Sequence, residues 1–195
     1  RTESIKGDAD DCTLKLIQYC HKLEHAGADF IVIPCNTSHA FFPSIQKEVS
    51  APILNLMEIT SDYILQNFPD AHNIGILATD GTIETHLYQK SLLSRNLQPI
   101  DFVNTPDMQH LVMQSIYSPK WGVKATGQTV SVNAVDALQQ SMDALMLQEC
   151  DLIISGCTEI SVAYRQANFS KKYPIIDPIK VVAEETLKYI YGYTE

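Results

Sequence analysis

Short apolar runs alternate with amphipathic segments along the whole chain. The run at 30–33 is continuous and largely β-branched, and a similar run recurs at 152–154. The segment before the first run instead places Leu16, Cys20 and Leu23 at helical spacing. A strand that is apolar on both faces belongs in a parallel sheet that helices cover. The alternation therefore predicts an α/β fold with parallel sheets flanked by helices.

Caps and turn residues divide this alternation into separate elements. Asp10 or Asp11 can cap the first helix, and Gly27 can end it. The predicted strands are 30–33, 51–56, 73–78, 100–103, 152–155 and 174–176. The predicted helices are 12–26, 39–49, 58–67, 82–95, 106–117, 129–148 and 179–191, with a loop at 118–127.

The second half of the chain repeats the first at a fixed offset. Cys35 and Cys157 differ by 157 − 35 = 122 positions, and the same shift places Asp29 on Asp151. It also matches the apolar positions of the preceding helices and the strands that begin at Pro52 and Pro174. A match of this length indicates a duplicated domain rather than a short structural repeat.

The duplication predicts two pseudo-symmetric lobes with the active site in the cleft between them. We expect a first lobe at 1–68, completed by 169–195, and a second lobe at 69–168. The partner of strand 74–77 would fall at 74 − 122 = −48, before the first residue. We therefore expect that about fifty residues, which form a first strand, its turn and the next helix, precede this sequence in the complete domain.

Composition and charge narrow the classes of function. The chain has 14 Lys and Arg against 23 Asp and Glu, and its net charge of −9 opposes broad contact with nucleic acid or anionic lipid. No apolar run approaches the roughly 20 residues of a membrane span, and the polar start is unlike a signal peptide. Five cysteines, an odd number, favour reduced thiols. We expect a soluble, cytoplasmic protein.

Cys35 and Cys157 each follow a predicted strand and precede a helical segment. Ligands of open parallel sheets bind at the carboxyl ends of the strands. A helix start can lower a thiol pKa from about 8.5 to roughly 3.5–7.5. If the two lobes face each other, one thiolate can remove a proton from a carbon while the other thiol delivers one to the opposite face. The two cysteines therefore predict an enzyme that inverts the configuration of a carbon atom.

The cysteines are also compatible with a packing role or a metal-binding role. Free cysteine is often simply buried, which is the favoured interpretation for Cys12, Cys20 and Cys150. Cys35 and His39 have a C-x3-H spacing that could bind a metal, but the chain has no CxxC or HExxH motif. We expect neither a metal nor another cofactor.

The two cysteine motifs resemble those of the aspartate/glutamate racemase superfamily. PCNTSH at 34–39 and GCTEI at 156–160 carry the resemblance, and GILATDGT at 75–82 and GVKATG at 122–127 extend it over nearly all of the chain. Glutamate racemases usually carry histidine after the second Cys-Thr pair. Glu159 stands there in this chain, which resembles the aspartate racemase branch.

The resemblance implies roles for individual residues. Cys35 and Cys157 match the catalytic pair, and Glu159 would orient the thiol region. Arg1 and Lys124 would bind the two carboxylates of the substrate, because a dianion pairs well with fixed cations. The other implied substrate-binding residues are Asn36, Thr37, Thr79 and Thr158.

These roles imply a cofactor-independent racemase that interconverts L- and D-aspartate. The resemblance also implies a homodimer and a small amino-acid substrate, with no nucleic acid or membrane as a partner. A glutamate-preferring or broad-specificity racemase and a maleate-type cis–trans isomerase are alternatives. From a different class, a non-catalytic amino-acid-binding protein would keep the pocket without the reaction.

Overall fold

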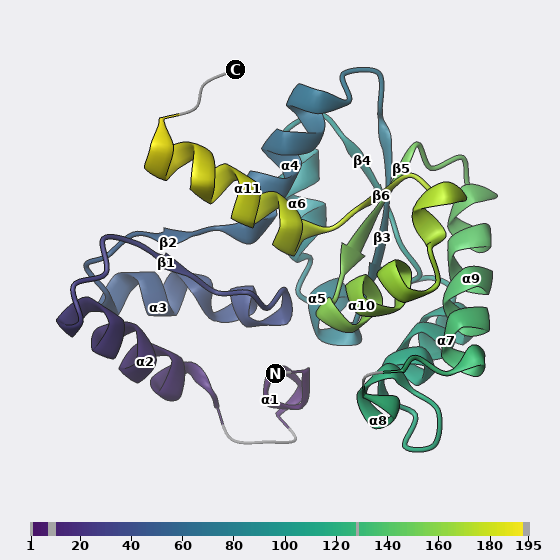
Figure 1. Ribbon diagram of the computed structural model, residues 1–195, viewed down its shortest axis with the longest axis horizontal. Helices are drawn as coiled ribbons and strands as arrows, with labels where there is room; N and C mark the ends of the chain where they lie inside the picture. The colour runs from purple at the N-terminus through teal and green to yellow at the C-terminus, as the bar shows by residue number, and fades with distance from the viewer. Residues whose placement is uncertain (1, 8–10, 128, 193–195) are drawn as a thin grey trace.

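A computed structural model describes residues 2–7, 11–127 and 129–192. Its larger sheet has four parallel strands in the order β4-β3-β5-β6, and a smaller sheet pairs β1 with β2 in parallel (Figure 1). The strands are β1 (Ile31–Val32), β2 (Ile53–Leu54), β3 (Asn73–Ala78), β4 (Gln98–Ile100), β5 (Leu152–Gly156) and β6 (Ile175–Ile176). The predicted α/β fold with parallel sheets is confirmed.

Helices connect these strands throughout the described residues. In the first half they are α1 (Thr2–Lys6), α2 (Thr13–His25), the 3₁₀ helix η1 (Thr37–Phe41), α3 (Phe42–Glu48) and α4 (Leu56–Asn67). In the second half they are α5 (Asp80–Glu84), α6 (Leu87–Leu93), α7 (Pro106–Tyr117), α8 (Val123–Thr126), α9 (Val132–Met146), α10 (Thr158–Gln166), η2 (Phe169–Lys171) and α11 (Pro178–Tyr191).

Several of these elements differ from the sequence prediction. The helix predicted at 82–95 is divided into α5 and α6, because His86 adopts a left-handed backbone with φ of 55°. The strand predicted at 100–103 lies earlier, since Asp101 accepts a hydrogen bond from the Val103 amide and turns the chain there. The predicted loop at 118–127 contains the short helix α8.

Helices cover both faces of the larger sheet, as its apolar strands require. Successive residues of a strand point to opposite faces. Ile76 of β3 therefore packs in one core with α4, α6 and α11, whereas Leu77 packs in a second core with α7, α9 and α10 (Figure 1). A third core joins the smaller sheet to α2 and α3. The strand ends, which carry the candidate site, are thus held between packed layers.

The internal repeat extends to the register of the strands. Ile31 pairs with Ile53 in the smaller sheet, and the residues 122 positions later, Ile153 and Ile175, pair in the larger one. The helix caps that follow these strands correspond as well. The Asn55 side chain accepts from the amide of Met57 at the start of α4, and Asp177 accepts from the amide of Ile179 at the start of α11. The two halves therefore share one backbone plan.

The segment predicted to complete the first lobe, 169–195, is divided between two neighbours up to residue 192. Its strand β6 pairs with β5 in the larger sheet, whereas its helix α11 packs against α4 (Figure 1). The helices α4 and α11 are equivalent in the repeat, so the two halves meet through corresponding elements. The exact lobe boundaries stay a prediction.

Within the described ranges, no helix combines the length and apolar character that crossing a membrane requires.

Candidate active site

Two strand ends in the larger sheet place predicted site residues side by side. Ala78 at the end of β3 is paired with Gly156 at the end of β5, so Thr79 and Cys157 follow on neighbouring parallel strands. Adjacent strands lie about 4.8 Å apart. A Cβ on Gly156 would lie 2.7 Å from the Cβ of Ala78, which explains why glycine precedes this cysteine.

Three threonines connect the first cysteine motif to this edge. The Thr37 hydroxyl lies 3.1 Å from that of Thr79 and 2.9 Å from that of Thr82, and all three side chains are buried. A Cβ on Gly81 would lie 2.8 Å from Cγ2 of Thr37, so this glycine permits the close approach. Because Cys35 is two residues before Thr37, the contact brings both cysteine motifs to one region.

The turn that carries Cys35 is held by a buried histidine. Nδ1 of His39 donates to the Cys35 carbonyl at 3.0 Å, and Nε2 accepts from the Leu56 amide at 3.2 Å. Burial lowers the pKa of His39, which fits this neutral form. Since both ring nitrogens are engaged, Cys35 and His39 are not arranged as a chelating pair. The thiol of Cys35 itself is half-buried.

The turn that carries Cys157 is instead built around a carboxylate. Cys157 caps α10 with an extended backbone, and its Sγ donates to Oε2 of Glu159 at 2.9 Å. The Thr158 hydroxyl donates to the same oxygen at 3.0 Å, and Nζ of Lys124 donates to Oε1 at 2.5 Å. Glu159 therefore accepts from three predicted site residues.

These contacts fix the proton positions around Cys157. Burial raises the pKa of Cys157 well above its ordinary value, and the charge of Glu159 adds to the shift. Burial alone would raise the pKa of Glu159, but hydrogen bonds from Cys157 and Lys124 outweigh it and lower the pKa to about 2. At neutral pH the group is thus a thiol bonded to a carboxylate. The lowered thiol pKa that the helix start suggested is wrong for Cys157, because Glu159 and burial dominate.

Lys124 is positioned by a glycine turn and an aromatic ring. Gly122 caps α8, and a Cβ there would lie 2.6 Å from the Ser118 amide nitrogen. Nζ of Lys124 lies 5.3 Å from the centre of the Tyr117 ring, within cation–π range. Burial lowers the pKa of Lys124, but the hydrogen bond to Glu159 and the charges of its neighbours, Glu159 above all, together outweigh burial, so the net pKa is raised. Lys124 is thus a charged group beside Cys157.

Several site neighbours escaped the sequence analysis. Thr82 belongs to the GILATDGT segment and could have been found from that motif. Tyr117 and Tyr88, which contact Lys124 and Asn36, carry no signal in the sequence. Arg1, predicted to bind a carboxylate, lies outside the described residues.

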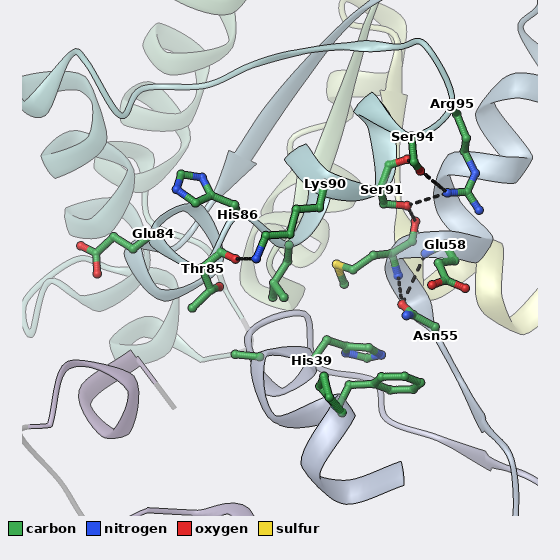
Figure 2. Close-up of a pocket in the computed structure, with 15 residues that line it drawn as sticks. His39, Asn55, Glu58, Glu84, Thr85, His86, Lys90, Ser91, Ser94 and Arg95 are labelled. Atoms are coloured by element: carbon green, nitrogen blue, oxygen red, sulfur yellow. Dashed lines mark hydrogen bonds between the residues drawn. The ribbon is translucent and has the colours of Figure 1, made fainter. Parts of the chain in front are cut away.

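Two cavities lie near this region, but the predicted cysteines do not line either of them. Figure 2 shows the larger one, of about 640 Å³, between η1, α3 and α4 on one side and α5 and α6 on the other. His39 lines this cavity, so the cavity adjoins the back of the Cys35 turn. The second cavity, of about 590 Å³, lies against α7. The candidate site is therefore defined by its hydrogen bonds and strand ends.

Known proteins resemble this chain in sequence. The family described as Asp/Glu/Hydantoin racemase matches residues 1–186. The broad specificity amino-acid racemase RacX of Bacillus subtilis (strain 168) is 30% identical over 187 residues, which cover 95% of this chain and 75% of RacX. A glutamate racemase of Carboxydothermus hydrogenoformans is 29% identical over 188 residues, which cover 94% of this chain and 61% of that protein.

Solved structures share the fold. A Yersinia pestis crystal structure is similar with a TM-score of 0.76 and 26% identity, covering 96% of this chain and 77% of that one. The aspartate racemase of Picrophilus torridus has a TM-score of 0.70 at 22% identity, over 91% of this chain and 68% of that one. The named relatives act on different amino acids, so the family alone does not fix the substrate. The match over residues 1–186 and the identity to RacX show that the chain belongs to the Asp/Glu/Hydantoin racemase family.

Proposed function

We propose that this protein interconverts L- and D-aspartate without a cofactor, with Cys35 and Cys157 exchanging protons at the α-carbon. The observation that carries the proposal is the contact of Thr37 with Thr79, which joins the first cysteine motif to the strand end beside Cys157. Two cysteine motifs that meet through this contact support a reaction that needs an acid and a base on opposite faces of a carbon.

The proton roles follow from the different surroundings of the two thiols. The hydrogen bond to Glu159 and the raised pKa keep the proton on Cys157, so Cys157 delivers it in one direction. In that direction the Cys35 thiolate takes the proton from the α-carbon, whose bonding pair remains on the substrate. The S–H bond of Cys157 then breaks as the new C–H bond forms. The opposite direction exchanges the two roles.

Polar groups around the thiols suit an amino acid with a second carboxylate. Asn36, Thr37, Thr79 and Thr158 provide donors for the α-carboxylate and acceptors for the amino group. The charged Lys124 can pair with the side-chain carboxylate of the substrate, although Lys124 also donates a hydrogen bond to Glu159. In this assignment Glu159 orients Cys157 and Lys124 rather than touching the reacting carbon.

A second candidate is broad-specificity or glutamate-preferring racemisation. The 30% identity to RacX over 95% of the chain favours it. A panel of L- and D-amino acids, followed by circular dichroism with deuterium exchange from solvent, separates these substrates. Exchange at the α-carbon also separates a racemase from a cis–trans isomerase, which changes the geometry of a double bond instead.

The test of the mechanism is the replacement of each cysteine in the full-length protein. Cys35→Ser and Cys157→Ser should each lower kcat for aspartate racemisation by about 10²-fold or more, the range of general acid–base catalysis. Substrate binding, measured by calorimetry, should change little. Cys12→Ser is the matched control, because Cys12 is also half-buried but belongs to neither motif. Wild-type turnover in either site variant would overturn the mechanism.

Dimer formation and cytoplasmic localisation stay predictions. Size-exclusion chromatography with light scattering tests the first, and cell fractionation tests the second.

A further inference from the structure

Tyr88 links the second half of the chain to the first cysteine motif. It lies in α6, and its side chain is fully buried. Its hydroxyl donates to Oδ1 of Asn36 at 2.5 Å, although the two residues are 52 positions apart. Tyr88 therefore reaches the residue directly after Cys35 without belonging to either cysteine motif.

The other end of the Asn36 amide has no partner among the described residues. Nδ2 is buried without a hydrogen bond, and only 2% of the residue is exposed. A buried donor without an acceptor is destabilising, and native proteins rarely keep one without a reason. An acceptor supplied by a bound ligand, such as a carboxylate, would satisfy Nδ2.

The usual structural role of asparagine does not explain this side chain. Asn36 stands at the cap position of η1, but its side chain makes no capping hydrogen bond. Asn55 offers a direct contrast, because its side chain accepts from the amides of Met57 and Glu58 at the start of α4. The Asn36 amide is held by Tyr88 instead of by the backbone that follows it.

We propose that Tyr88 is a positioning residue for the reaction, and that it fixes the Asn36 amide so that Nδ2 donates to the α-carboxylate of the substrate. This inference rests on the proposed function and adds a residue to it. An O–H donor at Oδ1 selects one of the two flipped orientations of an amide. The opposite orientation would present Oδ1 to the carboxylate, and the two oxygens would repel each other.

The variant Tyr88→Phe tests the proposal because it removes only the hydroxyl and keeps the ring in the core. We expect kcat/KM for aspartate to fall about tenfold, mainly through KM, as for the loss of one hydrogen bond. Tyr173→Phe is the matched control. Tyr173 is also buried, and its hydroxyl donates at 2.7 Å to Asp143, which is not a predicted site residue. An unchanged kcat/KM in Tyr88→Phe overturns the inference.

A double-mutant cycle separates positioning from a general structural defect. If Tyr88 acts through Asn36, then Tyr88→Phe has no further effect on kcat/KM in an Asn36→Ala background. Multiplication of the two effects overturns the inference. Should Tyr88→Phe fail to fold, Asn36→Asp decides, because it keeps the acceptor for Tyr88 and replaces Nδ2 by an oxygen. A greater loss than in Asn36→Ala supports the role of Nδ2, and an equal loss overturns it.

A readout independent of activity distinguishes this inference from the proposed function. The Asn36 side-chain amide can be followed by ¹⁵N NMR, with its signals assigned from Asn36→Asp. We expect Tyr88→Phe to shift or broaden these signals while most backbone signals stay in place. If the wild-type protein racemises nothing, the proposed function fails, and unchanged Asn36 signals in Tyr88→Phe would separately overturn the positioning role.

Discussion

The two cysteine turns follow equivalent strands, but different side chains surround the two thiols. Each follows a buried parallel strand, and the two strands pair with their neighbours in the same register. After Cys35 the chain forms a 3₁₀ helix whose first residues are buried, with neutral polar side chains and His39. After Cys157 it forms α10, where Glu159 accepts from Cys157 and Lys124.

The two halves therefore share the backbone geometry of the cysteine turn but differ in the side chains that surround each thiol. Cys157 donates to a carboxylate that holds its proton. Within the described parts of the chain, no carboxylate hydrogen-bonds the thiol of Cys35. The proposed two-thiol mechanism needs one proton donor and one acceptor in each direction, and in that proposal the protonated Cys157 is the donor of one direction.

Steady-state rates of the forward and reverse reactions cannot reveal this difference between the two thiols. The equilibrium constant between enantiomers is unity, so kcat/KM must be equal in the two directions for any variant. The two turns are therefore distinguished by measurements on each thiol and on each turn separately.

The largest effect is expected where the first turn meets the second half. Gly81→Ala would place a Cβ 2.8 Å from Cγ2 of Thr37 and 2.9 Å from Oγ1 of Thr2. We expect a loss of about 1–3 kcal/mol in the free energy of unfolding, as for an overpacked core, and a raised KM. Urea unfolding and steady-state kinetics measure the two effects.

A second substitution identifies the atom responsible. Thr37→Ser removes Cγ2 and keeps the hydroxyl that bonds Thr79 and Thr82. The double variant Gly81→Ala with Thr37→Ser should recover part of the lost stability. If Gly81→Ala alone unfolds like the wild type, the first cysteine turn and the turn after β3 are not in close contact.

An intermediate effect is expected from Glu159→Gln. It removes the negative charge beside Cys157, so the pKa of that thiol should fall, although burial still raises it. A fall of one pKa unit increases the thiolate fraction about tenfold. Site-resolved alkylation by iodoacetamide, followed by mass spectrometry between pH 7 and 9, compares Cys157 with Cys35 in the same sample.

The control removes an equal charge elsewhere. Glu184→Gln on α11 leaves the Cys157 turn intact, since Glu184 pairs with Lys180 on the same helix. We expect faster alkylation of Cys157 in Glu159→Gln only, with Cys35 unchanged in both variants. Equal acceleration at both cysteines would mean that the carboxylate acts on the whole site and that the two turns do not differ.

The features that the two cysteine turns share, a buried strand followed by a turn, could be predicted because local sequence patterns encode them. Continuous apolar runs marked β3 and β5, and the offset of 122 positions matched residues that occupy equivalent places in the strand register. Strands and turns of this kind depend mostly on which residues must be buried.

The side-chain surroundings that distinguish the two cysteine turns depend on contacts between segments far apart in the sequence. Lys124 meets Glu159 across 35 positions, and Tyr88 meets Asn36 across 52. The helix start after Cys157 predicted a lowered thiol pKa, but burial and one carboxylate reverse its direction. The break at His86 is likewise a left-handed residue that no local pattern required. Side-chain partners of this kind are fixed by tertiary packing.

The smallest effect concerns the pH dependence of the first turn. Burial lowers the pKa of His39 in the folded protein. The unfolded chain takes up this proton near the ordinary value of about 6.5. Below that pH the unfolded state binds more protons, so stability should fall with the pH until the folded pKa is reached. Each unit of lowering adds about 1.4 kcal/mol to this loss.

His39→Gln should remove that part of the slope, because glutamine does not titrate. Other ionisable groups, including Glu58, His86 and Lys90, line the neighbouring cavity (Figure 2), so the difference between variant and wild type is taken at each pH. Phe42→Leu is the matched control. Phe42 stacks on the His39 ring with centroids 6.1 Å apart, and its truncation should lower stability at every pH while the His39 contribution to the slope is kept at least in part, because the titrating ring remains. Urea unfolding from pH 5 to 8 measures both, and a wild-type slope in His39→Gln would show that the first turn is not held by a neutral histidine.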